Sequence, residues 1–212
     1  MDLYFSPLAC SMATRIALYE AGGTANFIEV DGKAKRAADG ADFYTINPLG
    51  QVPVLRTDEG EFLTENPAIL LYVADRYPQS GLAPADGTAR YRLLQWLCFV
   101  TSELHKLVFS PLLSPTSPEG AKAYAQEKAG QRLTVVDEHL VDHAYVLDDF
   151  TIADAYLFTV LNWARLTRVV DTTRYPRIAA YIERCLERPA IARALAEEAA
   201  LYQAELARRR AA

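Results

Sequence analysis

The chain has 212 residues, of which 51% are hydrophobic and 23% charged, a composition typical of globular proteins with a sizeable core. Its net charge is -5, and residues 1–80 account for all of it, with six basic and eleven acidic side chains. An acidic chain lacks the basic face of a nucleic-acid-binding protein, and no apolar run approaches the ~18 residues of a membrane span. The first residues also lack the pattern of a secretory signal. We therefore expect a cytoplasmic protein that binds neither nucleic acid nor membranes.

Two kinds of segment alternate in the first 80 residues. The β-prone runs are 3–5, 27–30, 52–55 and 61–63, and the helical stretches are 11–21 and 67–77. This alternation predicts an α/β domain over residues 1–80, followed by a Pro- and Gly-containing linker at 78–86. From 87 to 212 the apolar residues recur at helical spacing, which predicts a second, all-helical domain. Within it, Thr151 and Asp154 have the spacing of a helix capping box, a structural motif.

Three cysteines, at positions 10, 98 and 185, are too few and too widely spaced for a disulfide framework. Cys10 opens the first helix, where unpaired N–H groups and the positive helix end stabilise a thiolate. Its position equally allows a small buried hydrophobe, the usual role of a free cysteine. Cys98 and Cys185 lie inside helical stretches among apolar neighbours, which favours packing roles.

Two further motifs in the first domain carry open alternatives. In Val52-Pro53 the proline either starts a strand or forms a cis turn, beside which Val52 would offer both backbone groups to an extended peptide. At the start of the next helix, Asn66 is the expected N-cap and Pro67 the first helical residue. That helix start could also hold a ligand carboxylate, while Glu65 meets an ammonium.

Charged residues in the second domain have simpler interpretations. Glu103, His105 and Lys106 lie in mid-helix, where a solvated face is the ordinary explanation and where His105 and Lys106 cannot both be buried. His139 and His143 are four residues apart, as in some zinc sites, but no third ligand accompanies them, so we expect surface residues and no metal.

Five segments in order across both domains resemble bacterial beta-class cytosolic glutathione S-transferases. They are Phe5–Ser11, Asn47–Pro53, Thr64–Glu65, Trp96–Lys106 and Phe150–Phe158. The resemblance covers essentially the whole chain. It implies a thioredoxin-like N-terminal domain, an all-α C-terminal bundle and a homodimer that shares part of its site between subunits.

The resemblance also implies a glutathione site. Its residues would be Cys10, Ser11, Lys35, Val52, Pro53, Glu65, Asn66, Ser102, Glu103, His105 and Lys106. Cys10 would contact the glutathione sulfur with His105 nearby, which makes these two the catalytic candidates. Val52 would pair with the glutathione backbone before a cis Pro53. Lys35 would reach the glycine carboxylate.

The chain departs from the family pattern at three positions. Phe5 stands where several relatives have a tyrosine close to the sulfur, and Tyr4 lies on the opposite face of the strand. Cys98 replaces an Asn that can contact glutathione from the second subunit. Asn66 replaces a Gly or Ser, although its backbone contact should survive.

These features predict an enzyme that conjugates glutathione, as co-substrate, to small hydrophobic electrophiles. A first alternative is a thiol-disulfide oxidoreductase or reductive dehalogenase that works through a mixed disulfide of Cys10 with glutathione. A second alternative is a non-catalytic dimer that binds glutathione or hydrophobic molecules, because fold does not determine function.

Overall fold

The computed structural model describes residues 1–211, which form two compact units. Unit 1 comprises Met1–Leu82 and Arg188–Ala212, and unit 2 comprises Ala83–Glu187. The division at Leu82 falls within the expected linker. The expected helical domain 87–212 needs a correction at its end, since its last helix packs with unit 1. Within residues 1–211, no helix combines the length and hydrophobicity needed to cross a membrane.

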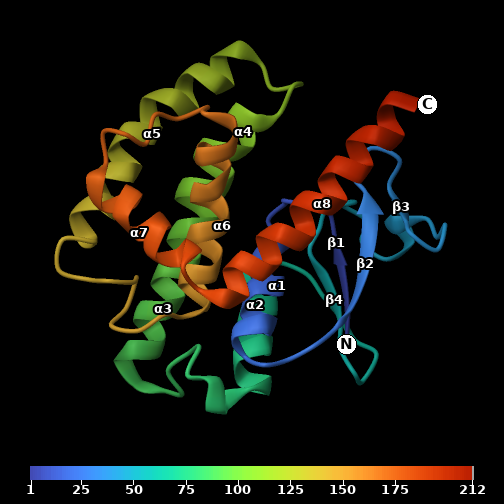
Figure 1. Cartoon of the computed structure of the whole chain (residues 1–212), viewed down its shortest axis with the longest axis horizontal. Helices are drawn as coiled ribbons and strands as arrows, with labels where there is room; N and C mark the ends of the chain where they lie inside the picture. The colour runs from blue at the N-terminus through green and yellow to red at the C-terminus, as the bar shows by residue number, and fades with distance from the viewer. Residues whose placement is uncertain (212) are drawn as a thin grey trace. The chain divides into compact units, whose positions relative to one another are not determined.

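Unit 1 is built on a mixed sheet with the strand order β3-β2-β1-β4-β5 (Figure 1). Its strands are β1 (Asp2–Phe5), β2 (Asn26–Asp31), β3 (Arg36–Ala37), β4 (Val54–Arg56) and β5 (Phe62–Leu63). Its helical segments are α1 (Met12–Glu20), η1 (Phe43–Thr45), α2 (Asn66–Arg76), η2 (Pro78–Ser80) and α8 (Pro189–Ala211). β1 and β2 are parallel, and the other pairs are antiparallel. β3 was not predicted, because a two-residue strand shows no hydrophobic period.

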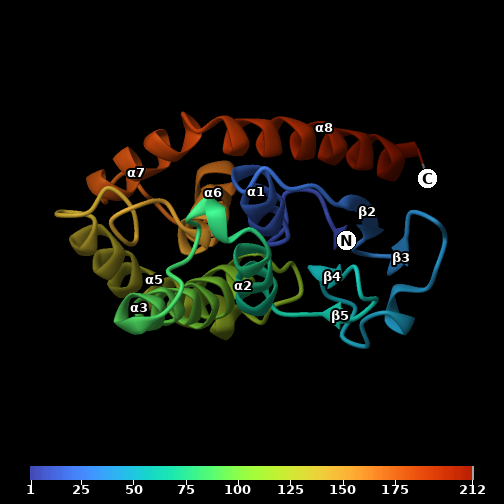
Figure 2. The same cartoon turned by 90° about the horizontal axis from the view of Figure 1, so that it is seen from below.

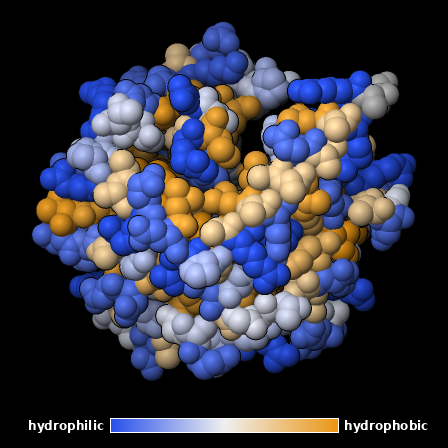
Figure 3. All heavy atoms as spheres, in the orientation of Figure 1, coloured by the Kyte–Doolittle hydropathy of each residue, from blue (hydrophilic) through white to orange (hydrophobic). Residues whose placement is uncertain are grey.

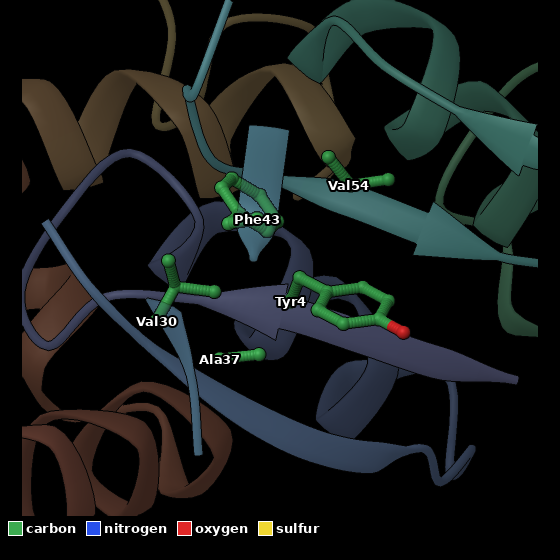
Figure 4. Close-up of a cluster of buried hydrophobic side chains, with 5 residues drawn as sticks. All are labelled: Tyr4, Val30, Ala37, Phe43 and Val54. Carbon is green, nitrogen blue, oxygen red and sulfur yellow. The ribbon is translucent and has the colours of Figure 1, made fainter. Parts of the chain in front are cut away.

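Side chains of β1 alternate between the two faces of this sheet, as the strand period requires. Tyr4 lies on one face in a buried cluster with Val30, Ala37, Phe43 and Val54, which Figure 4 shows gathered over the central strands. The ring centroids of Tyr4 and Phe43 are 5.9 Å apart in a tilted arrangement. This cluster anchors η1 and β3, which precede the segment that contains Val52.

The opposite face of the sheet carries Leu3 and Phe5, which are 0% and 2% exposed. The Arg15 guanidinium of α1 lies 4.5 Å from the Phe5 ring centre and 3.8 Å from that of Phe27. Such cation–π contacts gain strength when water is excluded. The Phe5 position is therefore occupied by hydrophobic and cation–π packing, and it offers no hydroxyl to a ligand.

Helix α8 runs along α1 and β2, as Figures 1 and 2 both show. Two hydrogen bonds of 2.7 Å join the Arg188 guanidinium to the Glu20 carboxylate at the end of α1. Ile191, Ala194 and Glu198 are fully buried on one stripe of α8. The outward side of α8 shows pale apolar spheres between blue ones in Figure 3, in keeping with its exposed alanines and charged residues.

Unit 2 is helical. Its segments are α3 (Gly87–Phe99), η3 (Val100–Phe109), α4 (Ser110–Leu113), α5 (Glu119–His139), α6 (Ile152–Thr167) and α7 (Pro176–Leu186). The helical stretch that begins at Gly87 changes type at Val100, where α3 is followed directly by η3, a π-helix. A π-helix is wider than an α-helix and is found frequently at functional sites. The motif that contains His105 lies on this segment.

The predicted capping box at the start of α6 is confirmed. The Asp154 carboxylate accepts from the Thr151 N–H at 2.9 Å and from the Val146 N–H at 2.8 Å. The Tyr181 hydroxyl also bonds Asp154 at 3.2 Å. Burial raises the pKa of the Asp154 carboxyl to about 6, although these hydrogen bonds oppose the shift. The cap is thus both a helix start and a buried polar centre of unit 2.

Candidate functional site

The loop that carries Cys10 connects β1 to α1 and is shaped by its own hydrogen bonds. The Ala9 N–H donates to the Ser6 carbonyl and the Met12 N–H to the Ala9 carbonyl, both at 3.1 Å. The fully buried Ser11 hydroxyl bonds both the N–H and the carbonyl of Ser6, each at 3.3 Å. The Ser11 side chain is therefore used inside the loop, and only its main chain is left for the glutathione contact predicted for it.

Cys10 lies one residue before the N-cap of α1 and is half-buried. Its thiol donates to the Val52 carbonyl oxygen at 3.2 Å. The carbonyl of Cys10 accepts from the Ala13 N–H at 3.3 Å and from the Asn66 side-chain amide at 3.2 Å. The structure thus brings together Cys10, Val52 and Asn66, which were predicted from three separate motifs.

Val52 presents one free backbone donor beside this thiol. The Val52–Pro53 peptide bond is cis, one of the two alternatives that the sequence left open, and Pro53 is buried. Among residues 1–211 the Val52 N–H has no hydrogen-bond partner. The Lys35 ammonium donates to the Gly50 carbonyl at 2.8 Å, two residues before Val52. A backbone donor, a backbone acceptor, a thiol and a cation therefore lie close together, as an extended acidic peptide requires.

The start of α2 differs from the sequence prediction by one residue. Glu65 is the N-cap, because its carbonyl accepts the first helical bond from the Ile69 N–H at 3.0 Å. Asn66 is the first helical residue, 4% exposed, and its amide is turned toward the Cys10 carbonyl. The Glu65 side chain is exposed and its φ is 65°. The helix N–H groups suit a ligand carboxylate and Glu65 suits a ligand ammonium.

Glu198 of α8 is a supporting residue that the sequence did not reveal. Its carboxylate is fully buried and accepts from the Leu8 N–H at 2.7 Å and from Arg15 Nε at 2.9 Å. Leu8 has a φ of 59°, an uncommon conformation for a bulky residue, within the Cys10 loop. Burial raises the pKa of Glu198 to about 7, while the Arg15 guanidinium opposes that shift. The spacing of Ile191, Ala194 and Glu198 on one buried stripe was the available signal.

In unit 2, the four predicted site residues lie on the π-helix η3. The Ser102 hydroxyl donates to the Cys98 carbonyl at 3.0 Å, so part of its capacity is used within the helix. Glu103 pairs with the Arg132 guanidinium of α5 at 2.9 Å. Lys106 is exposed, while His105 is only half-exposed, as expected for two neighbours that cannot both be buried.

His105 lies in an aromatic surrounding. Its Nδ1 is 2.7 Å from the Tyr156 hydroxyl, and its ring centre is 5.0 Å from that of Trp163, in an edge-on arrangement. The Phe109 ring in turn packs edge-on against Trp163, with the two ring centres 5.9 Å apart. Burial lowers the pKa of His105 to about 4, and the Lys106 charge adds to the effect. His105 is therefore a neutral imidazole at physiological pH.

Two other predictions need correction. Cys98 was expected among apolar neighbours but is exposed on α3, whereas Cys185 is fully buried as expected. His139 and His143 were expected at the surface but are half-buried, with rings stacked 4.3 Å apart. Trp96 packs on His139, and the two imidazoles bond the backbone carbonyls of residues 146 and 139. His139 and His143 therefore have a packing role between α3, α5 and the loop after α5.

Comparisons with known proteins agree with this geometry. The family model "Glutathione S-transferase, N-terminal domain" matches residues 2–75, and "Glutathione S-transferase, C-terminal domain" matches residues 96–189. The chain is 41% identical to glutathione S-transferase GstA of Escherichia coli O157:H7 over 200 residues, which cover 93% of this chain and 98% of the relative.

Solved structures give the same result. The bacterial glutathione S-transferase BphK, in a ternary complex, has a TM-score of 0.90 and 43% identity, with 94% of this chain and 100% of the other covered. A sphingomonad glutathione S-transferase complexed with glutathione has a TM-score of 0.88 and 44% identity, covering 94% and 99%. A beta-class enzyme of Sphingomonas chungbukensis is equally similar, with a TM-score of 0.88 and 44% identity. The predicted family resemblance and fold class are confirmed.

Proposed function

The chain belongs to the glutathione S-transferase family, and we propose that it binds glutathione at Cys10 and Val52 and conjugates it to small hydrophobic electrophiles. The observation that carries this proposal is the unpaired Val52 N–H beside the Cys10 thiol, 3.2 Å from the Val52 carbonyl. Glutathione is an extended tripeptide with a central thiol, so pairing with Val52 would present its sulfur to the Cys10 loop. The two backbone groups of Val52 would bind the central cysteinyl residue.

The two ends of glutathione would be held by opposite charges. Glu65 and the N–H groups at the start of α2 would bind the γ-glutamyl ammonium and carboxylate. The Lys35 ammonium, which donates to the Gly50 carbonyl at 2.8 Å, would donate to the glycine carboxylate of glutathione, either in place of that bond or in addition to it. Among the η3 residues, His105 would lie near the sulfur, and Ser102, Glu103 and Lys106 would supply outer polar contacts.

Calorimetry on two variants tests this binding mode. Val52→Ala keeps both backbone groups, so we expect glutathione affinity within about twofold of the wild type. Glu65→Gln removes the charge that faces the ammonium, and we expect a loss of at least about tenfold, or 1.4 kcal/mol. Equal losses in both variants, or none in Glu65→Gln, would contradict the assignment.

Cys10→Ala separates conjugation from the disulfide alternative. The half-buried thiol next to the Val52 peptide also suits exchange with oxidised glutathione: the Cys10 thiolate attacks one sulfur of the glutathione disulfide, that S–S bond breaks, and one glutathione leaves as its thiolate. If conjugation is the reaction, Cys10→Ala retains most of it with a chromogenic aryl halide and glutathione. If disulfide exchange is the reaction, the variant loses it and conjugation is slow in both proteins.

We also propose a homodimer in the cytoplasm. Tyr91 on α3, Leu49 before the Val52 segment and Phe62 on β5 are large apolar side chains with exposures of 73%, 69% and 47%. Exposed apolar groups of this size suit a subunit interface. Within residues 1–211 none of the three cysteines forms a disulfide, as is usual in a reducing compartment. Light scattering at micromolar concentration should give the mass of two chains, and the mass of one would contradict the dimer.

A further inference from the structure

Tyr156 of α6 forms a hydrogen bond with Nδ1 of His105 and leaves Nε2, the other ring nitrogen, available to a ligand. Tyr156 is 1% exposed, and its hydroxyl lies 2.7 Å from His105 Nδ1, with the two rings edge-on. The other ring nitrogen, Nε2, has no hydrogen-bond partner among residues 1–211. The two nitrogens of His105 therefore have different roles: one is committed to α6 and one is available.

Acidity decides which atom donates in the contact between Tyr156 and His105. A neutral imidazole has one N–H and one acceptor nitrogen, so the partner of Nδ1 determines what Nε2 can do. The phenol O–H, with an ordinary pKa of about 10, is a better donor than an imidazole N–H. At 2.7 Å the stronger arrangement is O–H of Tyr156 donating to Nδ1. The single ring proton then sits on Nε2.

Burial of His105 between Tyr156 and Trp163 favours the neutral ring, because a charged imidazolium would lose its hydration there. Lys106, the adjacent cation, also disfavours a second proton. Glu103 does not compensate, since it is paired with Arg132. The ring therefore stays neutral while one tautomer is selected by its hydrogen bond.

We propose that Tyr156 is a positioning residue that fixes His105 as the Nε2–H tautomer, so that His105 donates a hydrogen bond to an anionic ligand atom. The identity of that atom, the thiolate of glutathione, rests on the proposed function. In this role Nε2 stabilises an already formed thiolate and does not remove its proton. His105 is thus a hydrogen-bond donor in the reaction, and not a general base.

Nitrogen-15 NMR of histidine-labelled protein tests the tautomer without any substrate. The His105 signals are assigned from a His105→Gln variant. We expect the wild type to have a protonated Nε2 and an unprotonated Nδ1, and Tyr156→Phe to show a mixture of both tautomers. Tyr175→Phe is the matched control, because its hydroxyl bonds the Gly130 carbonyl at 3.3 Å and it should leave His105 unchanged.

A wild-type proton on Nδ1, or an unchanged tautomer in Tyr156→Phe, would overturn the proposal. If Tyr156→Phe does not fold, the wild-type spectrum alone decides. Conjugation kinetics then connect the tautomer to the reaction: we expect Tyr156→Phe and His105→Gln each to lower kcat by about tenfold with little change in KM for glutathione. An Nε2–H tautomer together with unaffected kinetics in both variants would reject the donor role while the tautomer assignment stands. Failure of the wild type to bind glutathione would instead reject the proposed function.

Discussion

The Cys10 loop and the surroundings of His105 are held by different kinds of contact. The loop donates hydrogen bonds to Glu198 of α8 and to the Val52 carbonyl and accepts one from Asn66 of α2, and each of these bonds joins a particular pair of atoms. His105 is enclosed by aromatic rings, with one hydrogen bond from Tyr156. Directional bonds fix where a reactive group lies, while aromatic burial determines whether a titratable group carries charge. The predictions below test this difference, from the largest expected effect to the smallest.

Glu198→Gln should have the largest effect, because it removes the fully buried counter-charge of Arg15. At pH 8 we expect a loss of about 3 kcal/mol in the free energy of unfolding, since Glu197 still contacts Arg15. Alkylation of Cys10 should also change in rate, because the Leu8 N–H loses its anionic partner. Urea denaturation and iodoacetamide labelling measure the two effects.

Glu197→Gln is the matched control on the same helix. Its carboxylate contacts the Arg15 guanidinium at 3.1 Å and the Arg193 guanidinium at 2.8 Å, but unlike that of Glu198 it is 37% exposed, so water screens its charge. Exposed pairs contribute about 0–1 kcal/mol, so this variant should remain close to the wild type. Equal stability losses in the two variants would show that the buried bond to the Cys10 loop has no special importance.

Asp154 should give unit 2 a measurable dependence on pH. The folded carboxyl keeps its proton up to about pH 6, whereas the unfolded one releases it near 3.8. Between these values the unfolded state binds fewer protons, so stability falls as pH rises from about 4 to 6, by at most about 3 kcal/mol. The stability difference between the wild type and Asp154→Asn should therefore shrink over this range. Urea midpoints at several pH values measure it, and a constant difference would argue against a buried, proton-retaining carboxyl.

Removal of one aromatic neighbour should restore part of the basicity of His105. In Trp163→Leu we expect the pKa of His105 to rise from about 4 by at least about one unit, because water reaches the ring. An NMR titration follows it. Trp96→Leu is the control, since Trp96 packs on His139 instead and should alter only that residue. A shift of His105 in both variants would point to a general loosening of unit 2.

The smallest expected effect concerns the choice between two accessible cysteines. Cys98 is exposed and Cys10 half-buried, so exposure alone favours Cys98. We expect oxidised glutathione to modify Cys10 at least about tenfold faster, because the Val52 peptide would hold glutathione beside it. Time-resolved peptide mass spectrometry identifies the modified residue, with Cys10→Ala and Cys98→Ala as controls. If Cys98 is modified before Cys10, the prediction that glutathione binds beside Cys10 is contradicted.

Local patterns in the sequence predicted what local contacts determine. The capping box of Thr151 and Asp154 was recognisable because both residues belong to one helical turn. The short strand β3 and the π-helix η3 were not, since two residues carry no period and a wider helix differs too little from an α-helix over ten residues.

The residues of the candidate site were predicted mainly from the family resemblance, and less from the physical properties of the residues and their spacing. Position alone left Cys10 undecided, because the bond of its thiol to Val52 joins residues 42 positions apart. Asn66 was expected to cap its own helix, yet tertiary structure turned its amide to the Cys10 carbonyl. Glu198 was overlooked, since its partner Leu8 is 190 positions away. Contacts of this range have no signature in a single sequence.

The packing of α8 on unit 1 has a consequence for how the chain is made. The bond from Leu8 to Glu198 joins the β1–α1 loop to a helix synthesised 190 residues later. During translation, residues 1–82 emerge from the ribosome before Glu198, the buried partner of Arg15, has been synthesised. All of unit 2 is translated between these two parts of unit 1. The Cys10 loop therefore gains this support only after Glu198 has been synthesised, so that a fully supported thiol site requires translation of unit 2 and of α8.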